Sequence, residues 1–280
     1  MGLTLAFEPC GAGSSSGFGR IISVQRDGPV RRPVASPKGH FIPACGGYNS
    51  TMLTQHRFRD RAEAGRALAK RLAAYEGDAD ALVLGLPRGG IPVAYEVARA
   101  LGAPLDVFVV RKLGVPGHEE LAMGAIASGG VTVFDPGFVD RIPRRELNSV
   151  VERESAELER REHLYRNHRA AQNPEGKVVI LVDDGLATGA SMQAAVHALR
   201  ALKLRKIVVA VPVASRDACE TMAHVADEVV CLLTPDRFYA VGQWYDNFSQ
   251  TSDDEVRTLL ERAAQEYATT HTAPTGDAQA

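Results

Sequence analysis

Two adjacent carboxylates, Asp183 and Asp184, are the side chains of this sequence best placed to do chemistry. They follow an apolar run at 178–182, whose Val, Ile and Leu composition is typical of a buried strand. The turn after them consists mostly of small residues and leads into a helical pattern. It comprises Gly185, Leu186, Ala187, Thr188, Gly189, Ala190 and Ser191. A buried strand, two acids, a flexible turn and a helix thus follow one another directly.

This turn is suited to an anion. In open α/β sheets, ligands bind beyond the carboxyl ends of the strands. A helix N-terminus there offers free N–H groups and the positive end of the helix dipole. Thr188 and Ser191 add hydroxyl donors, although Ser191 could instead serve only as a helix cap. We therefore expect residues 185–191 to hold a phosphate group.

Two acids beside a phosphate repel it unless the ligand also presents hydroxyl groups and a metal ion. Asp183 and Asp184 could accept hydrogen bonds from a ribose diol and hold Mg²⁺ directly or through water. Common nucleotide loops are excluded, because the segment has no Gly-Lys-Ser/Thr and no G-x-G-x-x-G after the strand. The pattern predicts a site for a sugar phosphate with a metal-bound group.

The elements that must position these residues alternate along the chain. Apolar runs that predict strands and amphipathic patterns that predict helices occur at 60–74 (helix), 81–86 (strand), 91–101 (helix), 105–110 (strand), 178–182 (strand), 191–202 (helix), 207–213 (strand), 217–223 (helix) and 228–233 (strand). This alternation indicates an α/β fold with a parallel β-sheet flanked by helices on both faces.

Three further segments lie between the second and third predicted strands. Residues 111–120 are polar and contain Gly and Pro, which predicts a loop. Residues 121–126 and 131–134 predict a hairpin. Residues 143–169 predict a long, charged, solvent-facing helix, in which Glu157 and Arg161 form an i,i+4 pair.

The composition is that of a globular protein, with 280 residues, 45% hydrophobic and 24% charged. A formal net charge of −2 gives no indication of nucleic-acid binding. No stretch reaches the roughly 20 apolar residues of a membrane span. The four cysteines form no C-x-x-C pair, so we expect neither a zinc site nor a disulfide, as in a reducing cytoplasm. Cys231 lies in an apolar run and is expected to be buried.

Composition also divides the chain. Residues 1–51 are rich in Gly, Ser and Pro, and we expect them to be disordered or to lie outside the native protein. Met52 is then a candidate start, and an intact mass matching residues 1–280 would reject that hypothesis. One domain is expected at 52–268, followed by a disordered tail at 269–280.

The segment from 178 to 191 resembles the phosphoribosyl pyrophosphate (PRPP) motif of type I phosphoribosyltransferases, in which apolar residues and two acids precede a Thr-Gly loop. From Phe58 to Val256 the chain also resembles a bacterial group of that family. The segments that carry this second resemblance are Leu86-Pro87-Arg88-Gly89-Gly90, Arg111-Lys112-Leu113-Gly114 with 119–125, and Phe238-Tyr239-Ala240-Val241-Gly242-Gln243-Trp244-Tyr245. The resemblance implies a mobile lid at 111–120 and a C-terminal hood at about 234–250.

The resemblance also implies an activity. It is the Mg²⁺-dependent transfer of ribose 5-phosphate from PRPP to a small-molecule nitrogen acceptor, with release of pyrophosphate, in cytoplasmic nucleotide metabolism. Asp183 and Asp184 would contact the ribose and Mg²⁺, and residues 187–191 would hold the 5-phosphate. The leaving pyrophosphate would meet the turn of Pro87, Arg88 and Gly89 and the lid residue Lys112.

Other points stay open in the sequence. A third acid that faces the base in purine-salvage relatives is replaced here by Ala187. The aromatic residues of the hood, Tyr239 and Trp244 among them, could stack on a base or form a small satellite core. The acceptor could be a purine, a pyrimidine or another amine. A PRPP- or nucleotide-sensing regulator and an enzyme that hydrolyses PRPP or a nucleotide remain alternatives, and the chain could form a homodimer.

Overall fold

The computed structural model describes residues 21–23, 40–42, 57–139 and 141–271. In this part of the chain the main sheet has six strands, all paired in parallel, in the order β2-β10-β9-β8-β3-β4. Their bounds are His40–Ile42 (β2), Ala81–Gly85 (β3), Leu105–Val107 (β4), Val178–Val182 (β8), Lys206–Val213 (β9) and Glu228–Leu233 (β10). The predicted parallel sheet is confirmed.

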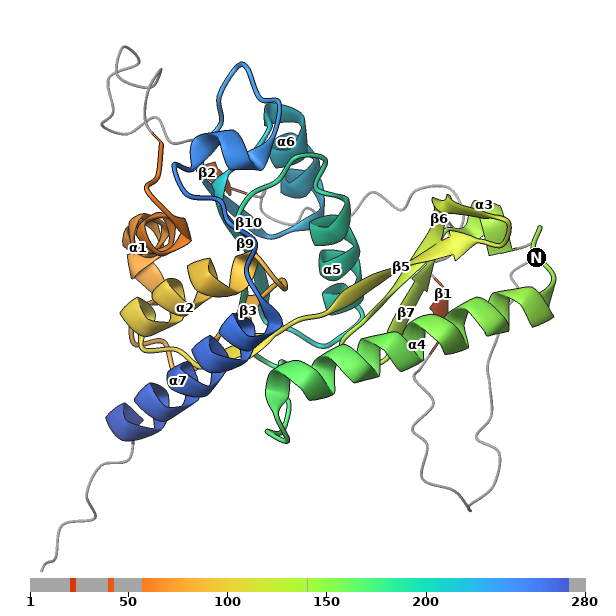
Figure 1. The fold of residues 1–280 in the computed structure, drawn as a ribbon, viewed down its shortest axis with the longest axis horizontal. Helices are drawn as coiled ribbons and strands as arrows, with labels where there is room; N and C mark the ends of the chain where they lie inside the picture. Colours follow the sequence, from red (N-terminus) through yellow and green to blue (C-terminus); the bar gives the residue numbers. More distant parts are fainter. Residues whose placement is uncertain (1–20, 24–39, 43–56, 140, 272–280) are drawn as a thin grey trace, which may run out of the picture.

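Helices cover both faces of this sheet (Figure 1). One face carries α1 (Arg61–Arg71), α2 (Gly90–Leu101) and α7 (Asp253–His271), and the other carries α5 (Ala190–Arg200) and α6 (Arg216–Val225). The helices end close to the predicted positions, except that α7 was not predicted. Its buried residues, Val256, Leu260 and Ala263, recur at helical spacing and pack into the core shared with α2.

The composition of β8 follows from its place between these layers. Val178, Ile180 and Val182 face the core beneath α1 and α2, whereas Val179 and Leu181 face the core beneath α5 and α6. Successive residues of a strand point to opposite faces, and helices cover both faces here, so all five side chains are buried. A strand covered on both faces must be apolar without interruption, as the sequence is here.

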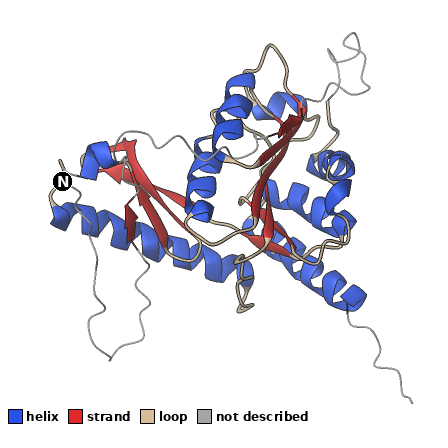
Figure 2. Ribbon diagram, turned by 180° about the vertical axis from the view of Figure 1, so that it is seen from behind, coloured by secondary structure: helices blue, strands red, loops and turns tan. Residues whose placement is uncertain are grey.

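A second, smaller sheet stands beside the first (Figure 2). Its strands lie in the order β1-β7-β6-β5 and span Ile21–Ser23 (β1), Val131–Phe134 (β7), His118–Ala127 (β6) and Val110–Val115 (β5). The predicted hairpin is confirmed, because β6 and β7 pair in antiparallel fashion. The sheet contacts α5 and α4 (Arg144–Arg166).

The prediction of a loop at 111–120 is wrong, because β5 and β6 form a second hairpin there. The register shifts at Gly114, where a Cβ would lie 2.8 Å from the Cα of Glu119. This close approach requires glycine, and Gly117 turns the chain with a φ of 76°. Glycines that serve a hairpin thus made the segment resemble a loop in the sequence.

The long charged helix is confirmed as α4, and Arg161 Nε lies 2.7 Å from Glu157 Oε1 as its spacing predicts. It does not face solvent alone, because Val150 and Leu158 are buried in the main core. Shorter helices occur at Ala73–Tyr75 (η1), Pro136–Val139 (α3) and Val241–Trp244 (η2).

Within residues 1–51 the structure describes β1 and β2, and the remaining residues lie outside the described part. The predictions for that segment and for 272–280 therefore stay predictions. The helix α7 extends to His271, into the expected tail. No helix among the described residues is both long and apolar enough to cross a membrane.

Candidate active site

The acid pair lies where two neighbouring strands end. Gly85 of β3 pairs with Val182 of β8, and the amide of Leu86 donates to the Val182 carbonyl at 2.9 Å. Because the strands are parallel, the turn after β3 leaves the sheet beside Asp183 and Asp184. The structure thus brings the predicted pyrophosphate turn, residues 87–89, next to the predicted ribose and metal residues.

Two glycines let this turn close onto the acids. A Cβ on Gly89 would lie 2.7 Å from Asp184 Cγ, and one on Gly90 would lie 2.9 Å from the Cα of Asp183. Side chains at these positions would separate the two loops. The peptide bond between Pro87 and Arg88 is cis. The guanidinium of Arg88 lies 3.8 Å from Asp253 Oδ1 at the start of α7.

Desolvation raises the pKa values of both acids in the half-buried pair. It raises the pKa of Asp183 well above its usual value, and repulsion from Asp184 adds to this effect. Desolvation also raises the pKa of Asp184, but the positive charge of Arg61 opposes that rise. Asp183 Oδ1 accepts a 2.8 Å hydrogen bond from the Asp184 amide, and no described cation forms an ion pair with Asp183. Asp183 thus has no direct ion-pair partner among the described residues and feels only the nearby charge of Arg61, which fits an oxygen-seeking divalent cation such as Mg²⁺.

The turn after the acids, residues 185–191, leads into the N-terminus of α5. Gly189 has a φ of 72°, and its carbonyl accepts the first hydrogen bond of the helix, from Gln193 at 2.8 Å. The amides ahead of Gln193 therefore lie before the first intrahelical bond. Ala187, Thr188 and Ser191 are exposed around them. These are the groups that a phosphate site needs.

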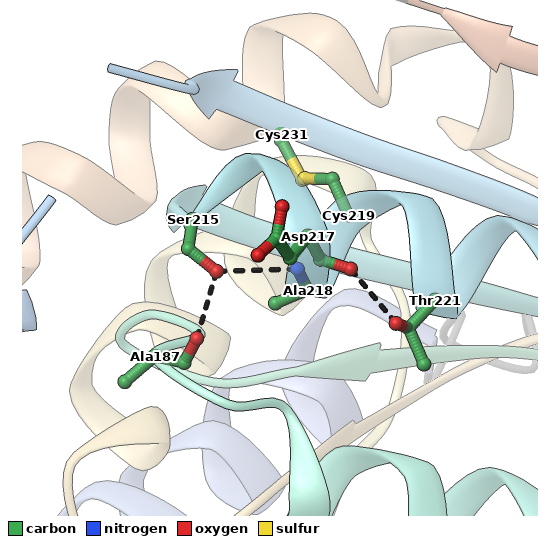
Figure 3. Close-up of a disulfide and its surroundings, with 7 residues drawn as sticks. All are labelled: Ala187, Ser215, Asp217, Ala218, Cys219, Thr221 and Cys231. Atoms are coloured by element: carbon green, nitrogen blue, oxygen red, sulfur yellow. Dashed lines mark hydrogen bonds between the residues drawn. A yellow bond between two sulfur atoms is a disulfide. The ribbon is translucent and has the colours of Figure 1, made fainter. Parts of the chain in front are cut away.

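Hydrogen bonds join the start of this turn to the sheet. Leu186 is buried, its amide donates to Val213 at 2.9 Å, and its carbonyl accepts from Ser215 at 2.9 Å. The Ser215 hydroxyl donates to the Ala187 carbonyl at 2.7 Å and accepts from the Ala218 amide at 3.1 Å (Figure 3). The N-cap of α6 thus holds the turn. Ser215 was not predicted from the sequence, although a serine directly before a predicted helix is a candidate N-cap.

The same view contains a disulfide between Cys219 of α6 and Cys231 of β10 (Figure 3). The prediction that no disulfide forms is therefore wrong for this structure. Both cysteines are buried, as expected for Cys231. The two residues come from a helix and the strand beneath it, a contact that sequence spacing alone does not reveal.

Most of the hood packs as a satellite core. The buried ring of Tyr245 packs with Phe58, Ala64 and Val213, and Trp244 lies against the same group. Burial raises the pKa of the Tyr245 hydroxyl. The indole nitrogen of Trp244 is buried without a described hydrogen-bond partner. In contrast, Tyr239 is 83% exposed, so it lies free at the hood surface. A base-stacking role for Tyr239 and Trp244 stays a prediction.

Lys112 is not joined to the acid pair. It lies exposed on β5 of the second sheet, and no described hydrogen bond or ion pair connects it to residues 183–191. Its neighbour Arg111 instead binds Glu154 of α4, with an Nε to Oε2 distance of 2.9 Å. A role for Lys112 at the leaving group stays a prediction.

The order of the parallel strands, together with the acid pair and the turn at 185–191 after β8, defines a phosphoribosyltransferase fold. The model of the phosphoribosyl transferase domain matches residues 54–248, so the chain belongs to this family, as its motifs predicted. It is 50% identical over 213 residues to "Putative phosphoribosyl transferase Rv0571c" of Mycobacterium tuberculosis H37Rv, and equally to its counterpart in strain CDC 1551. These matches cover 75% of this chain and 48% of the relatives, so the chain spans about half their length.

A solved structure shows the same fold. The crystal structure of TT1426 from Thermus thermophilus is 45% identical in sequence, with a TM-score of 0.67. The match covers 74% of this chain and 98% of that protein. The α/β architecture expected from the sequence is thereby confirmed.

Proposed function

We propose that the chain is a Mg²⁺-dependent phosphoribosyltransferase that uses PRPP as donor and a nitrogen nucleophile, such as a nucleobase, as acceptor. One observation carries the proposal: the half-buried acid pair at the end of β8 lies directly beside an open helix N-terminus. A sugar diol with a metal ion and a phosphate are the ligand groups that suit these two neighbouring sites.

In this proposal the donor contacts the acid pair and the turns at 87–89 and 187–191. Residues 187–191 bind the 5-phosphate through main-chain amides and the hydroxyls of Thr188 and Ser191. Asp183 and Asp184 accept hydrogen bonds from the ribose hydroxyls and hold Mg²⁺. When bound, Mg²⁺ neutralises charge on the pyrophosphate and on the acids. The turn at 87–89, which lies against Asp184, receives the pyrophosphate.

The reaction is a displacement at the anomeric carbon. The lone pair of the acceptor nitrogen forms the new bond to this carbon, while the bond to the pyrophosphate oxygen breaks and its electron pair leaves with pyrophosphate. Positive charge develops on the sugar, beside the acids, and negative charge on the leaving group, beside Arg88. Ala187 supplies no base, so the acceptor proton must pass to another group or to water.

A second candidate is a regulator that binds PRPP or a nucleotide with little turnover. Two observations favour it, namely the exposed position of Lys112 on β5 and the absence of an acid at Ala187. A sensor needs the residues that bind the donor, but it needs neither a closed lid nor a group that accepts a proton. The two candidates therefore share their binding site and differ in pyrophosphate release.

The test is pyrophosphate release from PRPP and Mg²⁺ with a panel of purines, pyrimidines and other amines. Acceptor-dependent release that disappears in Asp183→Asn/Asp184→Asn supports the transferase. Release without an acceptor indicates hydrolysis, and calorimetric binding without release indicates the sensor. If PRPP shows no Mg²⁺-dependent binding, the transferase and the PRPP sensor both fail, and calorimetry with nucleotides then tests the nucleotide sensor.

A role in cytoplasmic nucleotide metabolism and homodimer formation belong to the same proposal. The assay panel tests the first through the identity of the acceptor. Sedimentation of the purified protein tests the second, and a monomer at micromolar concentration would contradict it.

A further inference from the structure

The guanidinium of Arg61 joins three parts of the molecule. Arg61 is the first residue of α1, and its Nε and Nη2 atoms each lie 2.8 Å from Asp184 Oδ2. Its Nη1 atom donates to the Ser249 carbonyl at 2.7 Å, and its Cζ atom lies 4.0 Å from the centroid of the Phe248 ring. One side chain, only 12% exposed, therefore contacts both the acid pair and the end of the hood.

The contact with Asp184 is one-sided. Both nitrogens approach Oδ2, and no described hydrogen bond involves Oδ1. Arg61 therefore fixes the plane of the carboxylate while it leaves one oxygen for a ligand. It also places a positive charge beside two acids that the surrounding protein holds in a poorly hydrated site. The free oxygen suits a hydroxyl group of the ligand, and the positive charge favours an anionic donor, whereas the metal ion is left to Asp183, which has no ion-pair partner among the described residues.

From these contacts we infer that Arg61 is a positioning residue, which presents the acid pair to PRPP and holds the hood against it. The role toward PRPP rests on the proposed function, whereas the contact of Arg61 with the hood does not. The two acids then differ in role: Arg61 restrains the carboxylate of Asp184, and the carboxylate of Asp183 is left for the metal ion.

The shape of arginine suits this position. Its planar fork can donate to a carboxylate with two nitrogens and to a carbonyl with the third. A lysine ammonium at the same place cannot span both partners. The start of α1 is also fixed, because Asp60 caps the helix by accepting from the Glu63 amide at 2.8 Å. The hydrogen bonds of Arg61 thus start from a rigid base.

Two substitutions and one matched control test the inference. Arg61→Gln removes the charge and the fork, and Arg61→Lys keeps the charge alone. Arg66→Gln removes an ion-paired arginine from the same helix, away from the acid pair. Its partner Glu96 keeps Arg99, 2.6 Å away, so the control should fold normally.

The first measurement needs no ligand. The amides of Asp246 and Asn247 donate to the carbonyls of Phe58 and Arg59 at 2.8 and 2.9 Å, and their hydrogen exchange reports on the hood. We expect both Arg61 variants to exchange about tenfold faster there, while β8 is unchanged. Arg66→Gln should match the wild type. Unchanged hood exchange in Arg61→Gln overturns the inference.

The second measurement is calorimetric affinity for PRPP with Mg²⁺. Loss of a charge-assisted contact predicts affinity about tenfold weaker in Arg61→Gln, with Arg61→Lys between it and the wild type. If Arg61→Gln and Arg66→Gln lose the same amount of PRPP affinity, Arg61 has only a structural role and the inference is overturned. If the wild type itself does not bind, the proposed function fails, whereas the exchange result still decides the hood contact.

Discussion

The hydroxyl of Tyr245 donates a 2.6 Å hydrogen bond to the backbone carbonyl of Asp184. The hood is thus tied to the acid pair through the main chain, whereas Arg61 ties it through the carboxylate. Tyr245 also holds the core of the hood together, because its ring lies 5.7 Å from that of Phe58 and 5.1 Å from that of Phe248. Changes in the hood should therefore be felt at the site.

Removing this hydroxyl provides the first prediction. Tyr245→Phe leaves the Asp184 carbonyl without this buried donor, which should lower the free energy of unfolding by about 1 kcal/mol. PRPP affinity should fall as well, because Asp184 loses a restraint. Urea denaturation and calorimetry measure the two effects. Tyr239→Phe makes the same chemical change on an exposed hood residue, and equal effects in both variants would contradict the role of Tyr245.

The raised pKa of Asp183 predicts a conflict between stability and binding. A carboxyl whose pKa is raised by folding favours the folded state when protonated, and this contribution is lost as pH rises through the folded pKa. At pH 7, Asp183→Asn should therefore raise the free energy of unfolding of the ligand-free protein, by roughly 1–3 kcal/mol. The same variant should lose Mg²⁺-dependent PRPP binding.

The pH dependence supplies the control for Asp183. As pH falls through the raised folded-state pKa toward about 4, the usual value of a free carboxyl, the wild-type Asp183 becomes neutral, so the stability difference between wild type and Asp183→Asn should shrink. Thermal denaturation at pH 4 and pH 7 measures it. A variant that is less stable than the wild type at both values would show that Asp183 is not strained by its surroundings.

The approach of the two loops predicts an effect at Gly89. In Gly89→Ala the new methyl group meets the Asp184 carboxylate, so the loops must separate. Overpacking of this kind typically costs about 1–3 kcal/mol of stability, and PRPP binding should be lost. Gly137→Ala is the matched control, because its Cβ would meet a single Asp135 oxygen at 3.3 Å. Normal PRPP affinity in Gly89→Ala would show that the turn and the acids need no contact.

Lys112 tests whether the β5–β6 hairpin closes during turnover. Its side chain is exposed, so Lys112→Ala should leave the free energy of unfolding unchanged within about 0.5 kcal/mol. If the hairpin brings the ammonium to the leaving pyrophosphate, turnover should fall by about tenfold or more. Lys70→Ala on α1 serves as a surface control. Unchanged pyrophosphate release would remove Lys112 from the site.

The sheet and the donor side of the site could be predicted from sequence because their signals are local. The run Val178–Val182 must be apolar where helices cover both faces, and the acids and small residues follow it directly. The turn at 87–90 could be placed beside them because parallel strands end at a common edge.

The missed features depend on contacts between distant residues. Arg61 lies 123 positions before Asp184, and nothing in its own segment distinguishes it from the other arginines of α1. The β5–β6 hairpin was hidden because its glycines resemble those of a loop. The disulfide of Cys219 and Cys231 depends on how α6 packs over β10. Only the folded arrangement reveals these pairs.

The hydrogen bonds between Leu186 and the end of β9 have a consequence for how specificity can change. They make the turn at 185–191 an extension of the sheet, so its shape is set when the core folds and little order remains to be gained on binding. The hood belongs to a separate stretch of chain after β10. If the hood contacts the acceptor, as the sequence predicts, substitutions at an exposed hood residue such as Tyr239 can change the acceptor without disturbing the contacts of Tyr245 and Arg61 with Asp184.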